Sequence, residues 1–70
     1  MKIKEIEERT GLARANIRFY ESKGLVHPER QGNNYRDYSE EDVETLRKII
    51  LLRRLDMSIE DIQAILNGEL

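Results

Sequence analysis

Hydrophobic side chains recur every three or four residues through most of this 70-residue chain, and one stretch near the middle breaks the pattern. Such spacing gathers apolar side chains on one face of a helix. It predicts four helices, over about residues 3–9, 13–23, 40–55 and 59–67. Glycine follows three of them, at positions 11, 24 and 68, and supplies the left-handed conformation that ends many helices. The first two helices and their tight glycine turn predict a helix-turn-helix over about residues 3–23.

Residues 25–38 form the interruption in the helical pattern. Pro28 disfavours a helix, and the Gly-Asn-Asn run at 32–34 tolerates the positive φ of a turn. Tyr35 to Tyr38 alternates in character and carries β-favouring tyrosines. The segment therefore predicts a two-stranded hairpin, or wing, with its tip near Gln31 to Asn34. The predicted fold class is mainly α: a winged helix-turn-helix of about four helices, in which residues 40–55 and 59–67 form supporting helices.

Two of the predicted helices begin with a serine that has a carboxylate three residues later. Ser39 precedes Asp42, and Ser58 precedes Asp61. A hydroxyl and a carboxylate at this spacing cap the free N–H groups of a first helical turn. Capping accounts for the acidic residues at 40–42, so we do not interpret them as a metal site.

Length and composition indicate one small domain over residues 1–70 and exclude several classes of protein. The chain has no cysteine, hence no disulfide and no thiolate metal site, and we expect a cytoplasmic protein. The N-terminus lacks the apolar segment of a secretory signal, and the longest apolar run, residues 49–52, is too short to cross a membrane. His27, the one histidine, lacks a partner at ligand spacing and is expected on the surface. Without a phosphate-binding glycine loop or a nucleophile motif, we expect no enzymatic activity, no cofactor and no metal.

The net charge of −2 conceals an uneven distribution along the chain. Residues 9–36 hold six basic and two acidic side chains, a net charge of +4. Residues 39–70 hold four basic and eight acidic side chains, a net charge of −4. Such asymmetry orients a molecule toward a polyanion even when its total charge is near zero.

The two sides of the second helix differ in composition. At 100° per residue, we expect one side to face the core, with Ala13, Ile17 and Tyr20. The opposite side carries two cations, two small residues and one aromatic ring: Arg14, Ala15, Arg18, Phe19 and Ser22. Arginine pairs bidentately with guanine and an apolar ring contacts the thymine methyl group, so this side suits the major groove of DNA.

Each of these assignments has a purely structural alternative. The arginines could be solvated surface charges, and Phe19 could pack under the wing. Asn16 could read adenine or sit at the edge of the helix. Glu21 is expected to pair with Arg18 at three-residue spacing.

The wing places Arg36 between Tyr35 and Tyr38. A guanidinium grips phosphate in a planar fork, and a tyrosine hydroxyl can donate to a phosphate oxygen. Arg30 on the other strand is a further candidate for a phosphate contact. We also expect at least one of the two tyrosines to fill the core beneath the hairpin.

Three segments in order resemble the MerR family of transcription regulators. They are Thr10-Gly11-Leu12 followed by Ile17-Arg18-Phe19-Tyr20-Glu21; Lys23 to Pro28 followed by Tyr35-Arg36-Asp37-Tyr38-Ser39; and the capped helix followed by residues 57–62. The resemblance implies sequence-specific binding of double-stranded DNA to control transcription. It implies homodimers on a palindromic promoter, with the second helix in the major groove and RNA polymerase as a partner. Four residues match positions linked to DNA contact in the family: Arg18, Tyr20, Arg36 and Tyr38.

The chain also departs from the family pattern. Asn34 and Asp56 stand where glycine is usual, and both residue types tolerate the same backbone. Ala13 replaces a common serine and Asn16 a common threonine, which bears on the operator contacts. Family members continue into a dimerisation helix and an effector domain, which we expect to be absent here. We therefore expect an excised domain or a short member, monomeric or weakly dimeric, that binds DNA near the non-specific range of ~10⁻⁴–10⁻⁶ M.

Two other functions compete with transcription control. An excisionase-like architectural DNA-binding protein would share the winged fold. A helical protein-interaction module would use the acidic half and bind no nucleic acid. Absence of duplex binding even at low salt would favour the second of these alternatives.

Overall fold

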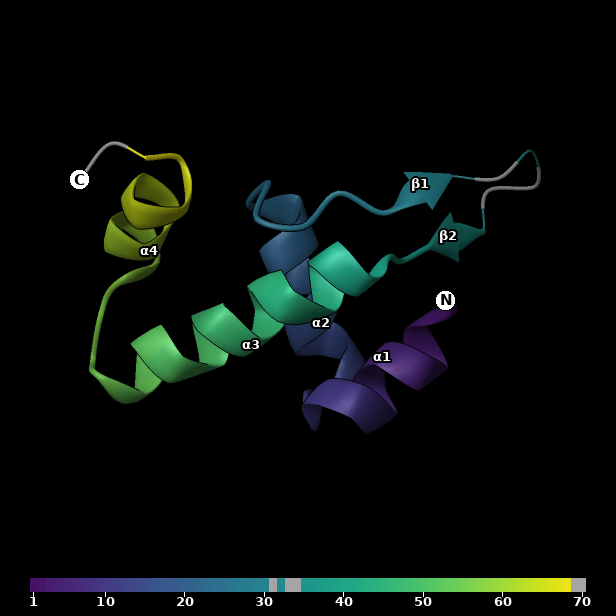
Figure 1. The fold of residues 1–70 in the computed structure, drawn as a ribbon, viewed down its shortest axis with the longest axis horizontal. Helices are drawn as coiled ribbons and strands as arrows, with labels where there is room; N and C mark the ends of the chain where they lie inside the picture. The colour runs from purple at the N-terminus through teal and green to yellow at the C-terminus, as the bar shows by residue number, and fades with distance from the viewer. Residues whose placement is uncertain (31, 33–34, 69–70) are drawn as a thin grey trace.

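The structure is a computed structural model that describes residues 1–30, 32 and 35–68. The described residues form four helices and one two-stranded antiparallel hairpin, shown in Figure 1. The elements are α1 (Ile3–Thr10), α2 (Arg14–Ser22), β1 (Glu29–Arg30), β2 (Arg36–Asp37), α3 (Glu40–Arg54) and α4 (Ile59–Leu66). This order confirms the predicted mainly α, winged helix-turn-helix fold, and the helix bounds differ from the predicted ones by a residue or so.

A tight turn joins α1 to α2 and sets the angle between them. Gly11 adopts a positive φ of 78°, and its N–H donates to the carbonyl of Glu7 at 2.8 Å. The Thr10 hydroxyl donates to the Ile6 carbonyl at 2.7 Å and accepts from the Leu12 N–H at 3.2 Å. These bonds satisfy backbone groups that the end of a helix leaves free, so the turn is locally determined.

One expectation about α2 is wrong. Ala13, predicted to face the core, is exposed. It is the N-cap residue of α2, with extended backbone angles of −70° and 151°, so helical periodicity does not apply to it. Leu12, one residue earlier, packs against the core instead.

The wing pairs Glu29 with Asp37 and Arg30 with Arg36. Gln31, Asn33 and Asn34 of the predicted tip lie outside the described residues. The N-terminus continues the pairing, because the Tyr38 N–H donates to the Met1 carbonyl at 2.7 Å and the Met1 amino group donates to the Tyr38 carbonyl at 2.6 Å. The first residues of the chain are thereby held beside the end of β2 (Figure 1).

The long helix α3 supports both the helix-turn-helix and the wing. Ser39 caps it as predicted: its hydroxyl accepts from the Asp42 N–H at 3.2 Å, and the Asp42 carboxylate accepts from the Ser39 N–H at 3.0 Å. Ser58 caps α4 through the Asp61 N–H at 3.1 Å. The Gln63 side chain of α4 donates to the Lys23 carbonyl at 2.8 Å, which ties α4 to the end of α2.

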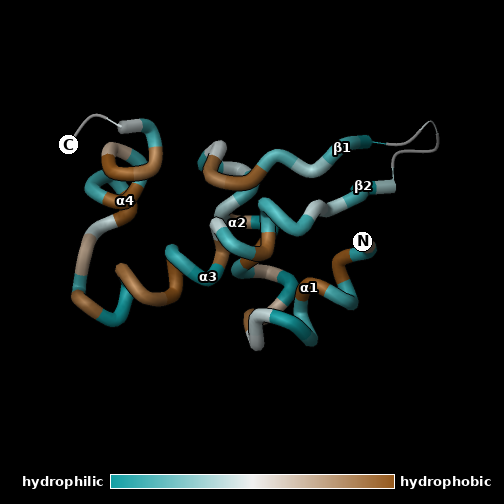
Figure 2. The backbone as a smooth tube through the Cα atoms, viewed as in Figure 1, coloured by the Kyte–Doolittle hydropathy of each residue, from teal (hydrophilic) through white to brown (hydrophobic). Residues whose placement is uncertain are grey.

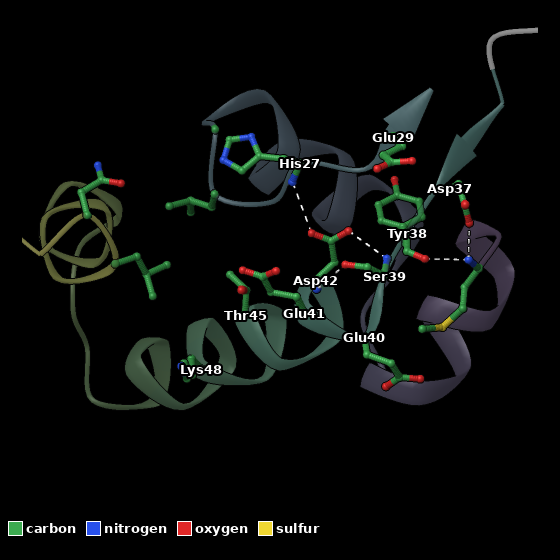
Figure 3. Close-up of a pocket in the computed structure, with 15 residues that line it drawn as sticks. His27, Glu29, Asp37, Tyr38, Ser39, Glu40, Glu41, Asp42, Thr45 and Lys48 are labelled. Carbon is green, nitrogen blue, oxygen red and sulfur yellow. Dashed lines mark hydrogen bonds and ion pairs between the residues drawn. The ribbon is translucent and has the colours of Figure 1, made fainter. Parts of the chain in front are cut away.

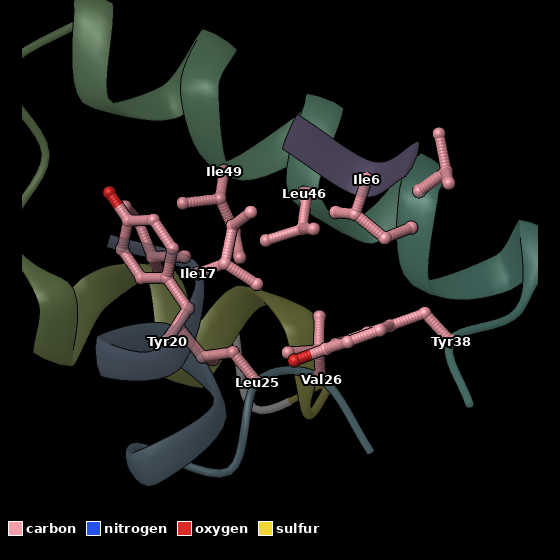
Figure 4. Close-up of a cluster of buried hydrophobic side chains, with 10 residues drawn as sticks. Ile6, Ile17, Tyr20, Leu25, Val26, Tyr38, Leu46 and Ile49 are labelled. Carbon is pink, nitrogen blue, oxygen red and sulfur yellow. The ribbon is translucent and has the colours of Figure 1, made fainter. Parts of the chain in front are cut away.

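The core contains side chains from every helix, from the segment before β1 and from the residue after β2 (Figure 4). Apolar stretches alternate with polar ones along each helix, as Figure 2 shows. The buried residues are Ile6, Ile17, Tyr20, Leu25, Val26, Tyr38, Val43, Leu46, Ile49 and Ile62. Each fully buried aliphatic side chain contributes about 1.5–3 kcal/mol to stability, so this cluster fixes the orientation of α2 and the wing.

Candidate nucleic-acid interface

The exposed face of α2 has the composition that the sequence predicts. Its five expected outward residues are all exposed: Arg14, Ala15, Arg18, Phe19 and Ser22. On the opposite side, Ile17 is 0% exposed and Tyr20 is 8% exposed. Core packing of these two residues therefore orients the helix and turns both arginines toward solvent.

Phe19 is 45% exposed, which contradicts the alternative in which the wing covers its ring. The ring makes an edge contact with Tyr20, with centroids 5.7 Å apart. The Lys23 ammonium lies 5.6 Å from the centroid of the Phe19 ring. An exposed ring beside a cation is available for an apolar contact with a partner whose surface is both negatively charged and partly apolar.

The two arginines of α2 differ in their partners. Arg14 forms an ion pair with Glu7 of α1, with Nη2 and Oε1 2.9 Å apart. Both side chains are partly exposed, and exposed pairs contribute about 0–1 kcal/mol, so Arg14 can exchange Glu7 for another anion at little cost. Arg18 does not pair with Glu21, and that prediction is wrong, because Glu21 faces the wing.

Glu21 joins α2 to the wing through three side chains. Its carboxylate lies 2.8 Å from Nε of Arg36 and 3.6 Å from Nη2 of Arg30. It also accepts a hydrogen bond of 3.2 Å from the Tyr38 hydroxyl. The hydrogen bond and the charge of Glu21 raise the pKa of Arg36. Glu21 thus holds the wing against the C-terminal half of α2, a role that the sequence analysis missed because these partners lie 9 to 17 residues away.

Tyr20 and Tyr38 are core residues in this structure. Tyr38 is 2% exposed and its ring lies among the aliphatic side chains of Figure 4. Burial first, and then the charge and hydrogen bond of Glu21, raise the pKa of Tyr38 to about 12. The expectation that a wing tyrosine fills the core is confirmed, whereas Tyr35 is 64% exposed.

The cationic side chains of α1, α2 and the wing meet at a hollow of about 300 Å³. Arg14, Arg18, Tyr35 and Arg36 line it, as do Lys2 and Lys4. The sequence does not mark the two lysines as part of a cationic surface, because Glu5, Glu7 and Glu8 follow them and outnumber their positive charges. The hydrogen bonds between Met1 and Tyr38 and the ion pair between the Met1 amino group and Asp37 bring Lys2 beside the wing.

A second and larger hollow, of about 930 Å³, lies beside α3 and is mostly polar (Figure 3). Its acidic members include Glu40 and Asp42. Asp42 is 7% exposed and accepts from the N–H groups of His27 and Ser39, so this carboxylate has a structural role. His27 itself is exposed, as expected.

Residues 1–30, 32 and 35–68 contain no group of three or more His, Cys, Asp or Glu side chains placed to hold a metal ion. Over the same residues, no helix has the length and apolar character needed to cross a bilayer.

Comparison with known proteins agrees with the fold. The sequence profile described as "MerR HTH family regulatory protein" matches residues 1–69. The transcriptional regulator HmrR of Rhizobium leguminosarum is 47% identical over 66 residues, which cover 94% of this chain and 51% of HmrR. A ZntR homolog from Haemophilus influenzae is 39% identical over 70 residues, covering 99% of this chain and 52% of the relative.

A solved structure shows the same fold. The crystal structure of the transcription regulator PbrR691 from Ralstonia metallidurans, in complex with lead(II), superimposes with a TM-score of 0.89 at 35% identity. The match covers 96% of this chain and 53% of that chain. The chain thus spans about half the length of the relatives it matches. These relatives are transcription regulators, so nothing here favours the excisionase-like alternative. The chain belongs to the MerR HTH family of regulatory proteins.

Proposed function

We propose that this chain binds double-stranded DNA sequence-specifically and that the protein thereby controls transcription from a promoter. The observation that carries the proposal is the exposed face of α2, where Arg14, Arg18 and Phe19 point away from the core beside a cationic hollow. Proteins that read DNA present such a helix to the major groove and hold the phosphate backbone with neighbouring cations. The transcriptional regulators among its relatives support the same function.

In this proposal α2 lies in the major groove. Arg18 and Arg14 pair with guanine, Phe19 contacts a thymine methyl group, and Asn16 is a further candidate for adenine. Arg36 contacts a phosphate from the wing. Tyr20 and Tyr38, both buried, contribute by setting the positions of α2 and the wing.

The proposal extends to the assembly. We expect the protein to bind as a homodimer, because two copies related by a two-fold axis match a palindromic site. Two exposed leucines near the C-terminal end of α3 support an interface: Leu51 is 58% exposed, and Leu55, which follows the helix, is 68% exposed. At a promoter the protein would act on RNA polymerase, and a DNA-bound regulator would work in the cytoplasm. Sedimentation of the protein at increasing concentration tests the dimer.

Duplex binding followed by fluorescence anisotropy tests the central claim. A duplex selected by the chain from a random pool should bind more tightly than a scrambled duplex, and both affinities should fall with salt. Amide chemical shifts should change in α2 and the wing on titration with the selected duplex. Absence of binding at low salt, or shift changes confined to α3 and α4, would overturn the proposal.

A further inference from the structure

The hollow beside α2 is built from three separate parts of the chain. Lys2 and Lys4 come from the start of α1, Arg14 and Arg18 from α2, and Arg36 from β2. Its volume is about 300 Å³. Among the described residues that line it, five are cationic and none is acidic. Like charges at such close range repel one another, so an arrangement of this kind is stabilised by an anion.

The acidic side chains nearby neutralise only part of this charge. Glu7 pairs with Arg14, and Glu21 pairs with Arg36. Lys2, Lys4 and Arg18 form no ion pair within 4.0 Å among the described residues. Three positive charges therefore remain uncompensated around one hollow.

The position of Lys2 is fixed by the backbone. The two hydrogen bonds between Met1 and Tyr38 hold the N-terminus beside the end of β2. The Lys2 ammonium lies 6.0 Å from the centroid of the Tyr35 ring, a cation–π arrangement. Lys2 therefore has a defined position against the wing.

We infer that this hollow binds a phosphate of the DNA backbone, with Lys2 and Lys4 as the contacts that complete it. The inference rests on the proposed function, since α2 in the major groove would place the hollow at the edge of that groove. Arg14 and Arg18 belong both to the exposed face of α2 and to the hollow. A phosphodiester at the border of the groove would meet the lysines while α2 contacts the bases. This contact sets the register of the helix on the duplex and does not read sequence.

The double variant Lys2→Gln/Lys4→Gln tests the inference, because it removes both charges and keeps most of the side-chain length. Its affinity for the selected duplex is measured between 50 and 200 mM salt. Losing one phosphate contact lowers the slope of log affinity against log salt by about 0.9. The fourfold rise in salt should therefore weaken the variant about 3.5-fold less than the wild type. The ratio of affinities for selected and scrambled duplexes should stay the same.

Lys48→Gln is the matched control. Lys48 is exposed on α3 and lines the other hollow, so this variant makes the same chemical change away from the cationic face. It should retain the wild-type salt slope. Thermal unfolding of all variants should follow the wild type, because both lysines at the start of α1 are exposed.

A neutral methylphosphonate, placed at each phosphate of the duplex in turn, identifies the contact. At one position the substitution should weaken the wild type and have little effect on the lysine variant. If the wild type binds duplex but the lysine variant keeps its slope, or no position shows this dependence, the phosphate site is wrong and the proposed function stands. If the wild type binds no duplex at low salt, both are wrong.

Discussion

The wing presents a cation on one side and an anion on the other, and both come from the same short strand, β2. Arg36 lines the cationic hollow and Asp37 lines the hollow beside α3. Successive side chains of a strand point to opposite sides, so alternation along β2 separates a cation from an anion. The side of the molecule with the hollow beside α3, the acidic face, uses its carboxylates within the fold. Asp42 caps α3, and Glu40 forms an ion pair with Arg9 of α1. A net charge of −2 is thus compatible with a strongly cationic surface, because the fold sorts the charges that the composition adds together.

The largest expected effect is a loss of stability on truncating a side chain of the core that orients α2 and the wing. Ile17 is 0% exposed and packs on the inner side of α2. Ile17→Ala should lower the free energy of unfolding by about 2–5 kcal/mol. Small domains have only about 0.05–0.15 kcal/mol of stability per residue, so urea denaturation should show a large loss of folded protein.

Asn16→Ala is the control for this variant, because Asn16 is the exposed neighbour of Ile17 on the same helix. It should change the free energy of unfolding by about 0.5 kcal/mol or less. Equal effects of the two substitutions would mean that α2 does not have the inner and outer sides described above.

The next effect concerns recognition. Arg18→Ala should reduce the discrimination between the selected and scrambled duplexes by about 1–3 kcal/mol, because a bidentate contact with guanine is lost. Its unfolding temperature should stay near the wild-type value, since the side chain is exposed. Lys48→Ala removes a cation from the opposite face and should leave discrimination intact. Unchanged discrimination in Arg18→Ala would contradict base reading by this face.

The sequence predicts the helices and their ends well, because interactions between residues close in the chain determine them. Three glycines take positive φ values close to 75°, each directly after or within two residues of a helix, and both serine caps form as their spacing indicates. Asp56 adopts a φ of 60°, the glycine-like backbone that the resemblance implies at this position. The buried and exposed sides of α2 follow from its periodicity, except at Ala13, which precedes the helix.

The sequence does not predict contacts that depend on how distant segments meet. A spacing rule assigned Glu21 to Arg18, but the folded hairpin brings Arg36 and Tyr38 closer to this carboxylate. Lys2 and Lys4 join the cationic hollow because Met1 is hydrogen-bonded to Tyr38, directly after β2. No periodicity within residues 1–8 signals that pairing.

A smaller effect should follow when Glu21 loses its charge. Burial and Glu21 together raise the pKa of Tyr38 to about 12, above its ordinary value of 10. The folded state therefore keeps the phenol proton at a pH where the unfolded chain releases it, so this stabilisation is present below pH 10 and is lost as the pH rises through about 12. In Glu21→Gln the pKa should fall toward 10, so the variant should lose less of its own neutral-pH stability than the wild type does as the pH rises from 10 to 12.

Ultraviolet titration of the tyrosines measures this pKa, with Tyr35→Phe to remove the signal of the exposed ring. The same Glu21→Gln variant should cost about 1–2 kcal/mol of stability, because charge-assisted hydrogen bonds to the wing become neutral ones. A Tyr38 pKa that stays at about 12 in the variant would show that burial alone sustains it.

The smallest expected effect on stability comes from the acidic face, at an ion pair between α1 and α3. The Arg9 guanidinium donates to both carboxylate oxygens of Glu40, at 2.6 and 2.8 Å, and this contact lowers the pKa of Glu40 below 4.5. A lowered pKa in the folded state gives stabilisation that is present above the unfolded value of 4.5 and is lost as the pH falls through the folded value. Because both groups are solvent-exposed, Glu40→Gln should shift the urea midpoint only slightly at neutral pH and not at all at low pH. The difference should shrink further in 1 M salt, where charges are screened within about 3 Å. A large loss of stability that salt does not change would mean that Glu40 supports the fold in the way Glu21 does. The two faces would then differ only in the sign of their charge.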